Sequence, residues 1–270
     1  MVGMLYFVAS PIGNLKDVSQ RAIEVLQSVD IILCEDTRTS FTFLNSINVN
    51  KPLESFHKFN YKEASKKVIE KLLSGKNIAL ITDAGTPCIS DPGSELIELL
   101  NENGIKYTII PGACAFVNAF ALSGFSAPLT FIGFLPNDKK EKRQLLEEIR
   151  NYKSTLIFYV APHKLNQDVE TLFEYFGDRK VCSVRELTKK FEEIEYFSLS
   201  KGYGKEPKGE YVLVVEGAKN SEESLNNLSI KQHYDYYLGL NYSKNDAIKQ
   251  VAKDRKVAKN EIYQVIVNEK

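Results

Sequence analysis

Ionisable side chains that could do acid–base chemistry follow an apolar run near the start of the chain. Glu35, Asp36 and Arg38 come directly after the apolar residues 31–34. A carboxylate in such a place can accept a proton or a hydrogen bond, and a guanidinium can hold an anion. The alternative is structural, because Asp36 or Thr37 could cap a helix that follows. A cap would leave Glu35 and Arg38 without a role.

Three further segments place small and turn-forming residues directly after apolar runs. The longest spans residues 82–93 and reads TDAGTPCISDPG, and shorter ones begin at Ser10 and Pro111. Residues 10–15 lack the GxGxxG dinucleotide pattern, so an ordinary strand-to-helix turn is an equal alternative there. Small side chains let backbone groups approach a ligand closely, and the longest segment exceeds what a turn requires. We therefore predict that residues 82–93 form a ligand-binding loop.

The elements that must position these segments are strands and helices in alternation. Apolar runs predict strands at residues 5–9, 31–34, 78–82, 107–110, 130–135, 155–160, 180–184, 193–198 and 211–215. Helical spacing predicts helices at residues 17–28, 60–74, 139–150 and 164–176, with start signals at Asp17, Asn60 and Asp91. The last two strands follow each other without a helix, which indicates an antiparallel portion. Elsewhere the alternation predicts mostly parallel sheets, which bind ligands beyond the carboxyl ends of their strands.

The predicted fold class is therefore α/β, with two α/β domains and a small helical C-terminal segment. The domains are expected at residues 1–111 and 112–226, and the helical segment at residues 227–270. A polar, Ser- and Asn-rich stretch at residues 218–227 is the expected linker.

Composition limits the possible partners and compartments. The 270 residues include 35 Lys+Arg and 35 Asp+Glu, a net charge of zero that excludes a protein coating polyanions over its whole surface. The four cysteines lie far apart without a CxxC pair, and three histidines are scattered among them. This spacing predicts no metal site and no disulfide framework, and it favours a reducing compartment. With no signal-peptide pattern at the N-terminus, we expect a cytoplasmic protein.

No charged residue occurs between Tyr107 and Asn137, a stretch long enough to span a bilayer. Prolines, glycines and polar residues interrupt it throughout. We therefore expect strand, turn and short-helix pieces in a protein interior or a subunit interface, and no membrane span.

Eight strings in order resemble one known family: VASPIGNL, CEDTRTS, LITDAGTPCISDPG, IIPGACA, FIGFLP, LIFYVAPHKL, VRELTKKFEE and KGEYVLVVEG. From about residue 4 to residue 217 the chain resembles the tetrapyrrole methylase superfamily, the class III S-adenosylmethionine-dependent methyltransferases. The EDTR and DAGTPxISDPG strings are typical of its branch that modifies small-subunit ribosomal RNA. The tetrapyrrole branch carries a GGDP-type loop instead.

This resemblance implies 2′-O-methylation of a cytidine ribose in the decoding centre of 16S rRNA in the small ribosomal subunit. It also implies a homodimer that binds S-adenosylmethionine between two α/β domains. The positions that match the family's cofactor contacts are Pro11, Asp83, Ala84, Gly85, Ser90, Cys114 and Ala115, with Tyr159 and Val160 as further candidates. Many members have Glu-Ser-Thr-His where this chain has Val160 to His163, which weakens a catalytic role for that turn.

Methyl transfer to a ribose hydroxyl requires alignment of the reactants and removal of a proton. Glu35 and Asp36 are the predicted base or hydrogen-bonding carboxylates, with Arg38 as a partner or phosphate contact. His57, in the segment 56–60 that we expect to end a further strand at the same edge of the sheet, is the rival base. Arg185 and Glu186 end a strand of the second domain. They could take part in the chemistry of the site, and an ion pair that holds the domain interface is an equally good interpretation.

RNA binding requires positive charge, and the C-terminal segment supplies it. Residues 241–260 hold six Lys/Arg against two Asp, at a spacing typical of a helix-turn-helix, with Ser243 and Asp246 as a capping box. The alternative is a helical appendage with a solvated basic face. A second basic run at residues 139–143 is either a surface that contacts RNA or the solvent-exposed face of a helix. Contacts to RNA phosphates at either place would make RNA binding depend on salt concentration. We expect no DNA partner.

Two other functions compete with rRNA methylation. A tetrapyrrole or other small-molecule methyltransferase could use the same fold, because a fold does not determine the substrate. A non-catalytic RNA-binding or regulatory protein could use the α/β body as a sensor. The complete small-residue loops favour an active cofactor site.

Overall fold

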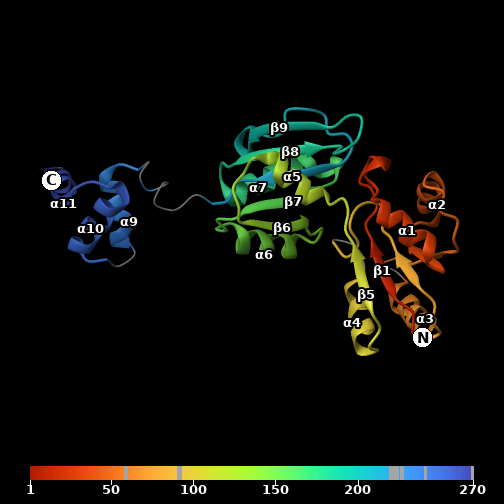
Figure 1. Ribbon diagram of the computed structural model, residues 1–270. Coiled ribbons are helices and arrows are strands. Elements are labelled where there is room, and N and C mark those ends of the chain that lie inside the picture. The colour runs from red at the N-terminus through yellow and green to blue at the C-terminus, as the bar shows by residue number, and fades with distance from the viewer. Residues whose placement is uncertain (58–59, 90–92, 219–224, 226–227, 240–241, 269–270) are drawn as a thin grey trace.

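The structure is a computed structural model that describes residues 1–57, 60–89, 93–218, 225, 228–239 and 242–268. Two α/β units, each built on a five-stranded sheet, come first along the chain, and a group of helices follows them (Figure 1). This arrangement confirms the predicted α/β class with its helical C-terminal segment.

The first sheet is entirely parallel, with the strand order β3-β2-β4-β1-β5. Its strands are β1 (Leu5–Val8), β2 (Ile31–Cys34), β3 (Leu53–Ser55), β4 (Ile78–Leu80) and β5 (Tyr107–Ile110). Because parallel strands point the same way, the segments after β1, β2, β4 and β5 emerge at one edge of the sheet. These are the segments that the sequence marked as candidates for chemistry.

Helices cover both faces of this sheet. On one face lie α1 (Gln20–Ser28) and α2 (Thr37–Ser46), and on the other lie α3 (Tyr61–Leu73) and α4 (Ser94–Glu102). Each helix buries apolar residues at helical spacing, such as Leu26 of α1 and Leu72 of α3.

The predicted helix start at Asp17 is wrong, and the start at Asn60 is confirmed in position without the expected side-chain cap. Asp17 ends a short 3-10 helix (Leu15–Asp17), and Ser19 caps α1 instead by accepting a hydrogen bond from the Ala22 N–H at 3.1 Å. The extended backbone of Val18 separates the two turns. Asn60 does precede α3, but its side chain accepts from the His57 N–H at 2.9 Å rather than from the helix. The Asp91 signal lies outside the described residues.

The second sheet is mixed and has the strand order β6-β7-β10-β8-β9. Its strands are β6 (Leu129–Phe134), β7 (Thr155–Val160), β8 (Lys180–Arg185), β9 (Glu193–Ser198) and β10 (Tyr211–Val215). The pair β6–β7 is parallel, and β10 is antiparallel to both β7 and β8. The predicted antiparallel portion is therefore present, although β8 lies between β9 and β10.

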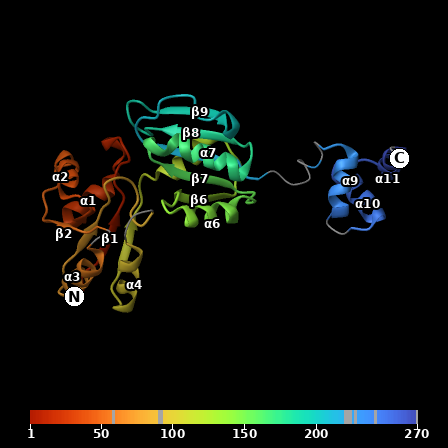
Figure 2. The same ribbon diagram turned by 180° about the vertical axis from the view of Figure 1, so that it is seen from behind.

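Helix α5 (Ala115–Ser123) packs on one face of the second sheet, and α6 (Lys139–Ile149) and α7 (Leu165–Phe176) pack on the other. Figure 2 shows the same arrangement from behind. The predicted domain boundary after residue 111 falls between β5 and α5. The uncharged residues 107–137 form β5, α5 and β6. Among the described residues, no helix has the length and apolar character that a membrane crossing requires.

The C-terminal group comprises α9 (Ile230–Gly239), α10 (Lys244–Arg255) and α11 (Lys259–Asn268). These helices share a core of their own that includes Tyr234, Val251 and Ile262. Ser243 caps α10 as predicted, since it accepts from the Asp246 N–H at 3.2 Å and its hydroxyl donates to the Asp246 carboxylate at 2.7 Å. Most of the predicted linker, including the boundary at residue 226, lies outside the described residues.

A buried polar cluster joins α9 to α10 within this group. His233 Nε2 lies 3.1 Å from Asp254 Oδ2, and the Tyr237 hydroxyl donates to the same oxygen at 2.5 Å. Arg255 Nε donates to His233 Nδ1 at 3.1 Å, so Nδ1 is the acceptor and the ring proton is on Nε2. Burial holds the pKa of the His233 imidazole below its ordinary value of 6.5.

We therefore expect the C-terminal group to lose stability as the pH falls below 6.5, the ordinary histidine pKa. In that range the unfolded state binds more protons than the folded state, so the free energy of unfolding decreases. Chemical unfolding followed by circular dichroism at about pH 7.5 and about pH 5.5 measures the difference, above the range where ordinary carboxylates titrate. The His233→Gln variant should lose this dependence. An unchanged dependence in the variant would assign it to another group.

Candidate active site

The segments after β1, β4 and β5 are tied together at the carboxyl edge of the first sheet. Ser10 and Gly85 exchange backbone hydrogen bonds of 2.9 and 3.1 Å. The Ser10 hydroxyl also donates to the Thr82 carbonyl at 2.9 Å, and the Thr86 hydroxyl donates to the Ala113 carbonyl at 3.0 Å. These bonds fix the three segments as one unit.

The segments after β1, β4 and β5 approach one another so closely that they require small residues. Gly85 has a φ of +87°, and a Cβ there would lie 3.3 Å from Ile12 Cγ2. A Cβ on Gly112 would lie 2.8 Å from the Ala9 Cβ, a separation that real Cβ atoms do not show. The glycines therefore let the three segments meet without filling the space beside them.

A cavity of about 480 Å³ opens beside these segments, between the two α/β units. This volume is in the range of small-molecule sites. The first unit contributes Ile12, Glu35, Asp83, Ala84, Gly85, Thr86 and Ile89 to its lining. The second contributes Cys114, Ala115, Phe134, Tyr159, Val160, Ala161, Pro162, Val184, Leu187, Glu210, Tyr211 and Val212.

Most of the predicted cofactor contacts lie together on this cavity. They are Asp83, Ala84, Gly85, Cys114, Ala115, Tyr159 and Val160. Pro11 is buried next to Ile12 and does not itself line the cavity. Ser90 lies outside the described residues.

Of the predicted acid–base residues, only Glu35 lines the cavity. Burial raises the pKa of its carboxyl group, and the negative charge of Asp83 raises it further. His57 does not line the cavity, although its charge acts on Glu35 in the opposite direction and lowers that pKa.

Asp36 has the structural role that the sequence left open. It caps α2, where one carboxylate oxygen accepts from the Arg38 N–H at 2.8 Å. Its other oxygen forms a 2.9 Å ion pair with the Arg38 side chain, which is 90% exposed. Hydrogen bonds from Arg38 lower the pKa of Asp36 to about 2. A carboxylate of such low pKa is a weak base.

Sequence reasoning missed several lining residues. Phe134 lies in the FIGFLP string, and Glu210, Tyr211 and Val212 lie in the KGEYVLVVEG string. Both strings contributed to the family resemblance and lie at the ends of strands, so they could have been used to predict these lining residues. Ile12 and Thr86 lie in segments that the sequence marked, at residues 10–15 and 82–93, and Leu187 adjoins Glu186 without a signal of its own.

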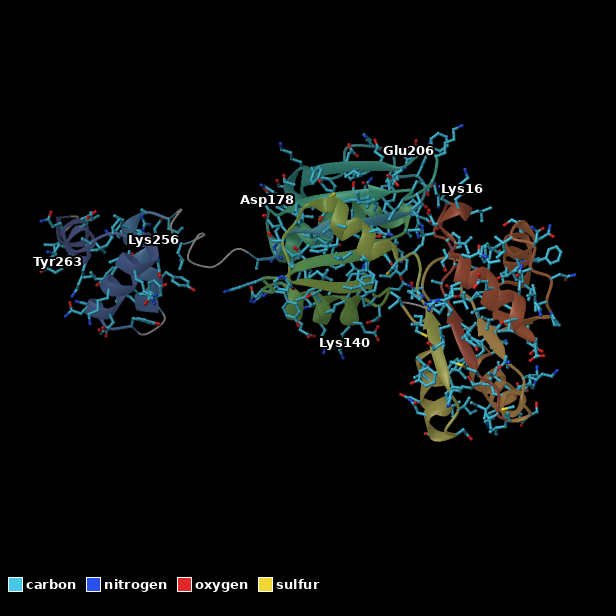
Figure 3. The ribbon with its side chains drawn as sticks, in the orientation of Figure 1. Lys16, Lys140, Asp178, Glu206, Lys256 and Tyr263 are labelled. Atoms are coloured by element: carbon cyan, nitrogen blue, oxygen red, sulfur yellow. The ribbon has the colours of Figure 1, made fainter. Side chains whose placement is uncertain are left out.

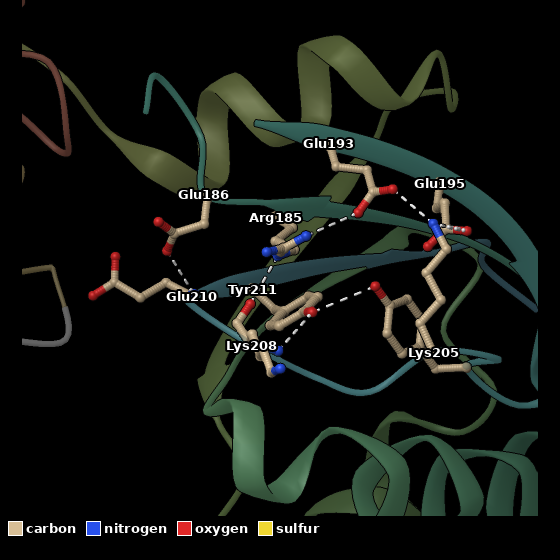
Figure 4. Close-up of polar contacts among 9 residues, drawn as sticks. Arg185, Glu186, Glu193, Glu195, Lys205, Lys208, Glu210 and Tyr211 are labelled. Atoms are coloured by element: carbon tan, nitrogen blue, oxygen red, sulfur yellow. Dashed lines mark hydrogen bonds and ion pairs between the residues drawn. The ribbon is translucent and has the colours of Figure 1, made fainter. Parts of the chain in front are cut away.

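Glu210 and Tyr211 are held by a polar network within the second unit (Figure 4). Glu186 Oε1 accepts from the Glu210 N–H at 2.9 Å. Lys189 Nζ donates to Glu186 at 3.1 Å and to the Glu210 carboxylate at 2.6 Å. The Tyr211 hydroxyl accepts from the Lys208 N–H at 3.2 Å. The network fixes this wall of the cavity.

The interpretation of Arg185 and Glu186 as an ion pair across the domain interface is wrong. Arg185 pairs with Glu193 at 3.1 Å and donates to the Lys208 carbonyl at 2.8 Å. Arg185 and Glu193 face each other across the antiparallel pair β8–β9, which explains the partner. Glu186 pairs with Lys189, again within the second unit.

The two units meet closely at Gly13, next to Ile12 of the cavity. A Cβ on Gly13 would lie 2.4 Å from Lys189 Cγ and 3.0 Å from the Leu187 carbonyl oxygen. Glu186 and Thr188, in the facing turn, both have positive φ angles, of 49° and 67°. Strained backbone of this kind persists where surrounding contacts determine it, and it is common beside functional sites.

The arrangement suits a ligand that has both polar and flat apolar parts. Glu35, Asp83 and Glu210 offer carboxylates that can accept from hydroxyl or ammonium groups. Phe134, Tyr159 and the aliphatic residues offer apolar surface for a ring. In the described ranges, no cluster of His, Cys, Asp and Glu could hold a metal ion.

Comparison with solved structures shows the fold. Uroporphyrin-III-C-methyltransferase from Thermus thermophilus aligns with 78% of this chain and 94% of its own, at a TM-score of 0.56 and 17% identity. The cobalamin biosynthetic enzyme cobalt precorrin-4 methyltransferase aligns with 79% of this chain and 94% of its own, at a TM-score of 0.56 and 19% identity.

Comparison of sequences shows the family. The model of the Tetrapyrrole (Corrin/Porphyrin) Methylases matches residues 4–201. Ribosomal RNA small subunit methyltransferase I of Bacillus subtilis (strain 168) is 42% identical over 97% of this chain and 93% of its own. The protein of that name from Halalkalibacterium halodurans is 43% identical over 97% of this chain and 94% of its own. The chain therefore belongs to the tetrapyrrole methylase family, in the group of the ribosomal RNA small subunit methyltransferases I.

Proposed function

We propose that the chain uses S-adenosylmethionine to methylate the ribose 2′-hydroxyl of a cytidine in 16S rRNA of the small ribosomal subunit. The observation that carries the proposal is the cavity between the two α/β units, which gathers Asp83, Ala84, Gly85, Cys114 and Ala115. The names of relatives at 42–43% identity support ribosomal RNA as the substrate. An rRNA substrate also agrees with the cytoplasmic setting expected from the sequence.

The residues present fit this cofactor. The volume of about 480 Å³ is in the range of sites for drug-sized ligands. Gly85 and Ala115 leave room for close backbone approach, and Asp83 offers hydrogen-bond acceptors. When bound, S-adenosylmethionine supplies the methyl group from its sulfonium. The chain's own task is to align the ribose with that methyl group and to exclude water.

Glu35 is the proposed proton acceptor for the ribose hydroxyl. It lines the cavity, and its raised pKa makes it a stronger base than Asp36. His57 is the second candidate, since its charge acts on Glu35.

Mass spectrometric mapping of ribose methylation in rRNA from cells with and without the gene tests the substrate. Loss of one cytidine methylation in the small-subunit RNA is the expected result. Calorimetry with S-adenosylmethionine tests the cofactor, and labelled cofactor with either small subunits or a porphyrinogen compares the substrates. Transfer to the porphyrinogen alone would replace this proposal with a tetrapyrrole methyltransferase.

We further propose that the C-terminal helices contact RNA phosphates. Lys244, Lys253 and Lys256 are exposed on or directly after α10. Figure 3 labels Lys256 and Tyr263 on this group, and Tyr263 is also exposed. Exposed lysines next to aromatic rings are suited to backbone contacts and base stacking.

Changing Lys244, Lys253 and Lys256 together to Gln is expected to weaken binding to small subunits. The slope of log affinity against log salt should become shallower by about 2, because up to three phosphate contacts are lost. Affinity for S-adenosylmethionine should not change. The matched control changes Lys62, Lys66 and Lys67 of α3, which are exposed on the first unit. An equal loss in the control would indicate a general charge effect.

We also propose that the chain forms a homodimer. Exposed apolar side chains support it, among them Val117 and Leu122 of α5 and Tyr196 of β9. The Tyr196 hydroxyl donates to the Leu122 carbonyl at 3.3 Å, so Tyr196 and Leu122 are neighbours on the surface. Sedimentation equilibrium of the full chain measures its mass in solution.

A further inference from the structure

Phe134 is a large apolar side chain exposed at a functional cavity. It lines the cavity, and 59% of its surface is accessible to solvent. Leaving a phenyl ring in water forgoes the free energy that burial would supply. Exposed apolar surface that adjoins a ligand cavity is typical of a binding site.

A β-bulge aims Phe134 at the cavity. In the pairing of β6 with β7, Phe131 lies opposite Ile157 and Phe134 lies opposite Tyr159, with an extra residue between them. Ile157 and Tyr159 point to the same face of the sheet, so the bulge turns Phe131 and Phe134 to that face as well. Gly133 makes the bulge possible through its φ of +76°. In a regular strand Phe134 would point to the opposite face.

Other aromatic rings hold Phe134 in place from behind. Its ring centroid lies 5.5 Å from that of Tyr159, and the Tyr159 ring lies 5.0 Å from Phe131. Phe131 in turn stacks on Phe116 of α5 at 4.2 Å. The Tyr159 hydroxyl accepts from the Phe116 N–H at 3.3 Å. A ring held in this way loses little conformational entropy when a second flat group binds it.

Two lysines follow Phe134 in the chain, after Leu135, Pro136, Asn137 and Asp138. Lys139 and Lys140 begin α6 five and six residues further on, and both are exposed. Figure 3 labels Lys140 at the surface of the second unit. Within the described part of the chain, no ion pair joins either lysine to a carboxylate. An exposed ring followed within six residues by two exposed lysines has the composition of a nucleic-acid surface.

We propose that Phe134 is the stacking platform for the base of the nucleotide whose ribose is methylated, with Lys139 and Lys140 on neighbouring phosphates. This inference rests on the proposed function. A ribose hydroxyl within folded RNA reaches a cavity when its nucleotide turns out of the stack. The base then loses its stacking neighbours, and an aromatic ring at the cavity mouth replaces them.

The test compares Phe134→Ala, Phe134→Leu and Phe134→Trp in methyl transfer to small subunits. Phe134→Ala is expected to raise the KM for small subunits by about tenfold or more, within the range measured for single base–aromatic stacks. Phe134→Leu should behave like Ala, because it is apolar without a π face. Phe134→Trp should restore the wild-type KM. The Kd for S-adenosylmethionine should stay within about twofold in all three, because the proposal assigns the exposed face of the ring to the base and not to the cofactor.

Phe191→Ala is the matched control, since Phe191 is 64% exposed and does not line the cavity. It should leave the KM unchanged. An unchanged KM in Phe134→Ala overturns the inference and leaves methyl transfer standing. A weaker Kd for S-adenosylmethionine in Phe134→Ala also overturns it, because the ring would then belong to the cofactor. Absence of transfer by the wild type overturns the proposed function and this inference together.

Discussion

Replacing Glu35 by Gln is expected to slow methyl transfer by about 10²–10⁴-fold, the usual contribution of a positioned general base. Glu35 is the one predicted acid–base residue that lines the cavity, and its side chain is half-buried there. Gln keeps the shape of the side chain and removes the proton acceptor. The affinity for S-adenosylmethionine should therefore change by less than about threefold, and kcat should carry the loss. Single-turnover transfer to small subunits with calorimetry of the cofactor measures both quantities.

The pH dependence of the rate gives a second measure of the same group. Burial and the charge of Asp83 raise the pKa of Glu35 above its ordinary value of 4.5. The base acts when deprotonated, so the wild-type rate should rise with pH through that raised pKa and then level off. The Glu35→Gln variant should lose this rise.

Asp36→Asn is the matched control, because Asp36 is the adjacent carboxylate and caps α2 outside the cavity. It should change the stability little, because Asn caps a helix about as well as Asp does, and it should leave kcat nearly unchanged. Full activity in Glu35→Gln with a large loss in His57→Ala would transfer the role to His57.

The strands were predictable because each is a short apolar run bounded by turn residues. Residues 155–160, 193–198 and 211–215 were predicted with the bounds that the structure has. Strands β7 and β10 are buried on both faces, so local composition and tertiary packing favour the same state there. The lining of the cavity by residues 83–86 was predictable for a related reason. The run of small and turn-forming residues at 82–93 is a local signature in the sequence.

The missed features depend on contacts between segments far apart in sequence. The partner of Arg185 follows from the register of β8 with β9, and no local pattern states that register. Phe134 reaches the cavity through a bulge at Gly133, whose effect appears only when β6 pairs with β7. Glu35 and Asp36 are adjacent carboxylates, so the sequence alone could not tell which of them is the better candidate for a base. The start of α2 separates them, since it engages Asp36 as a cap and leaves Glu35 to the cavity.

The two α/β units meet closely at Gly13, next to Ile12 of the cavity. Gly13→Ala should weaken binding of S-adenosylmethionine by about tenfold or more, which corresponds to about 1.4 kcal/mol. The new Cβ would lie 2.4 Å from Lys189 Cγ and 3.0 Å from the Leu187 carbonyl oxygen. Lys189 cannot move freely, because Glu186 and Glu210 hold its ammonium group. Relief of the clash must therefore separate the Ile12 and Leu187 walls of the cavity.

Calorimetry and thermal unfolding together distinguish this effect from general instability. Gly204→Ala is the control, since a Cβ there meets nothing within 4 Å, and it should change neither measurement. Gly13→Ala should lower the free energy of unfolding by about 1–3 kcal/mol, as overpacking does. Combining it with Lys189→Ala removes the nearest clashing atom and should recover part of the lost affinity. If the loss of affinity in the double variant equals the product of the two single losses, the clash with Lys189 is not what weakens cofactor binding.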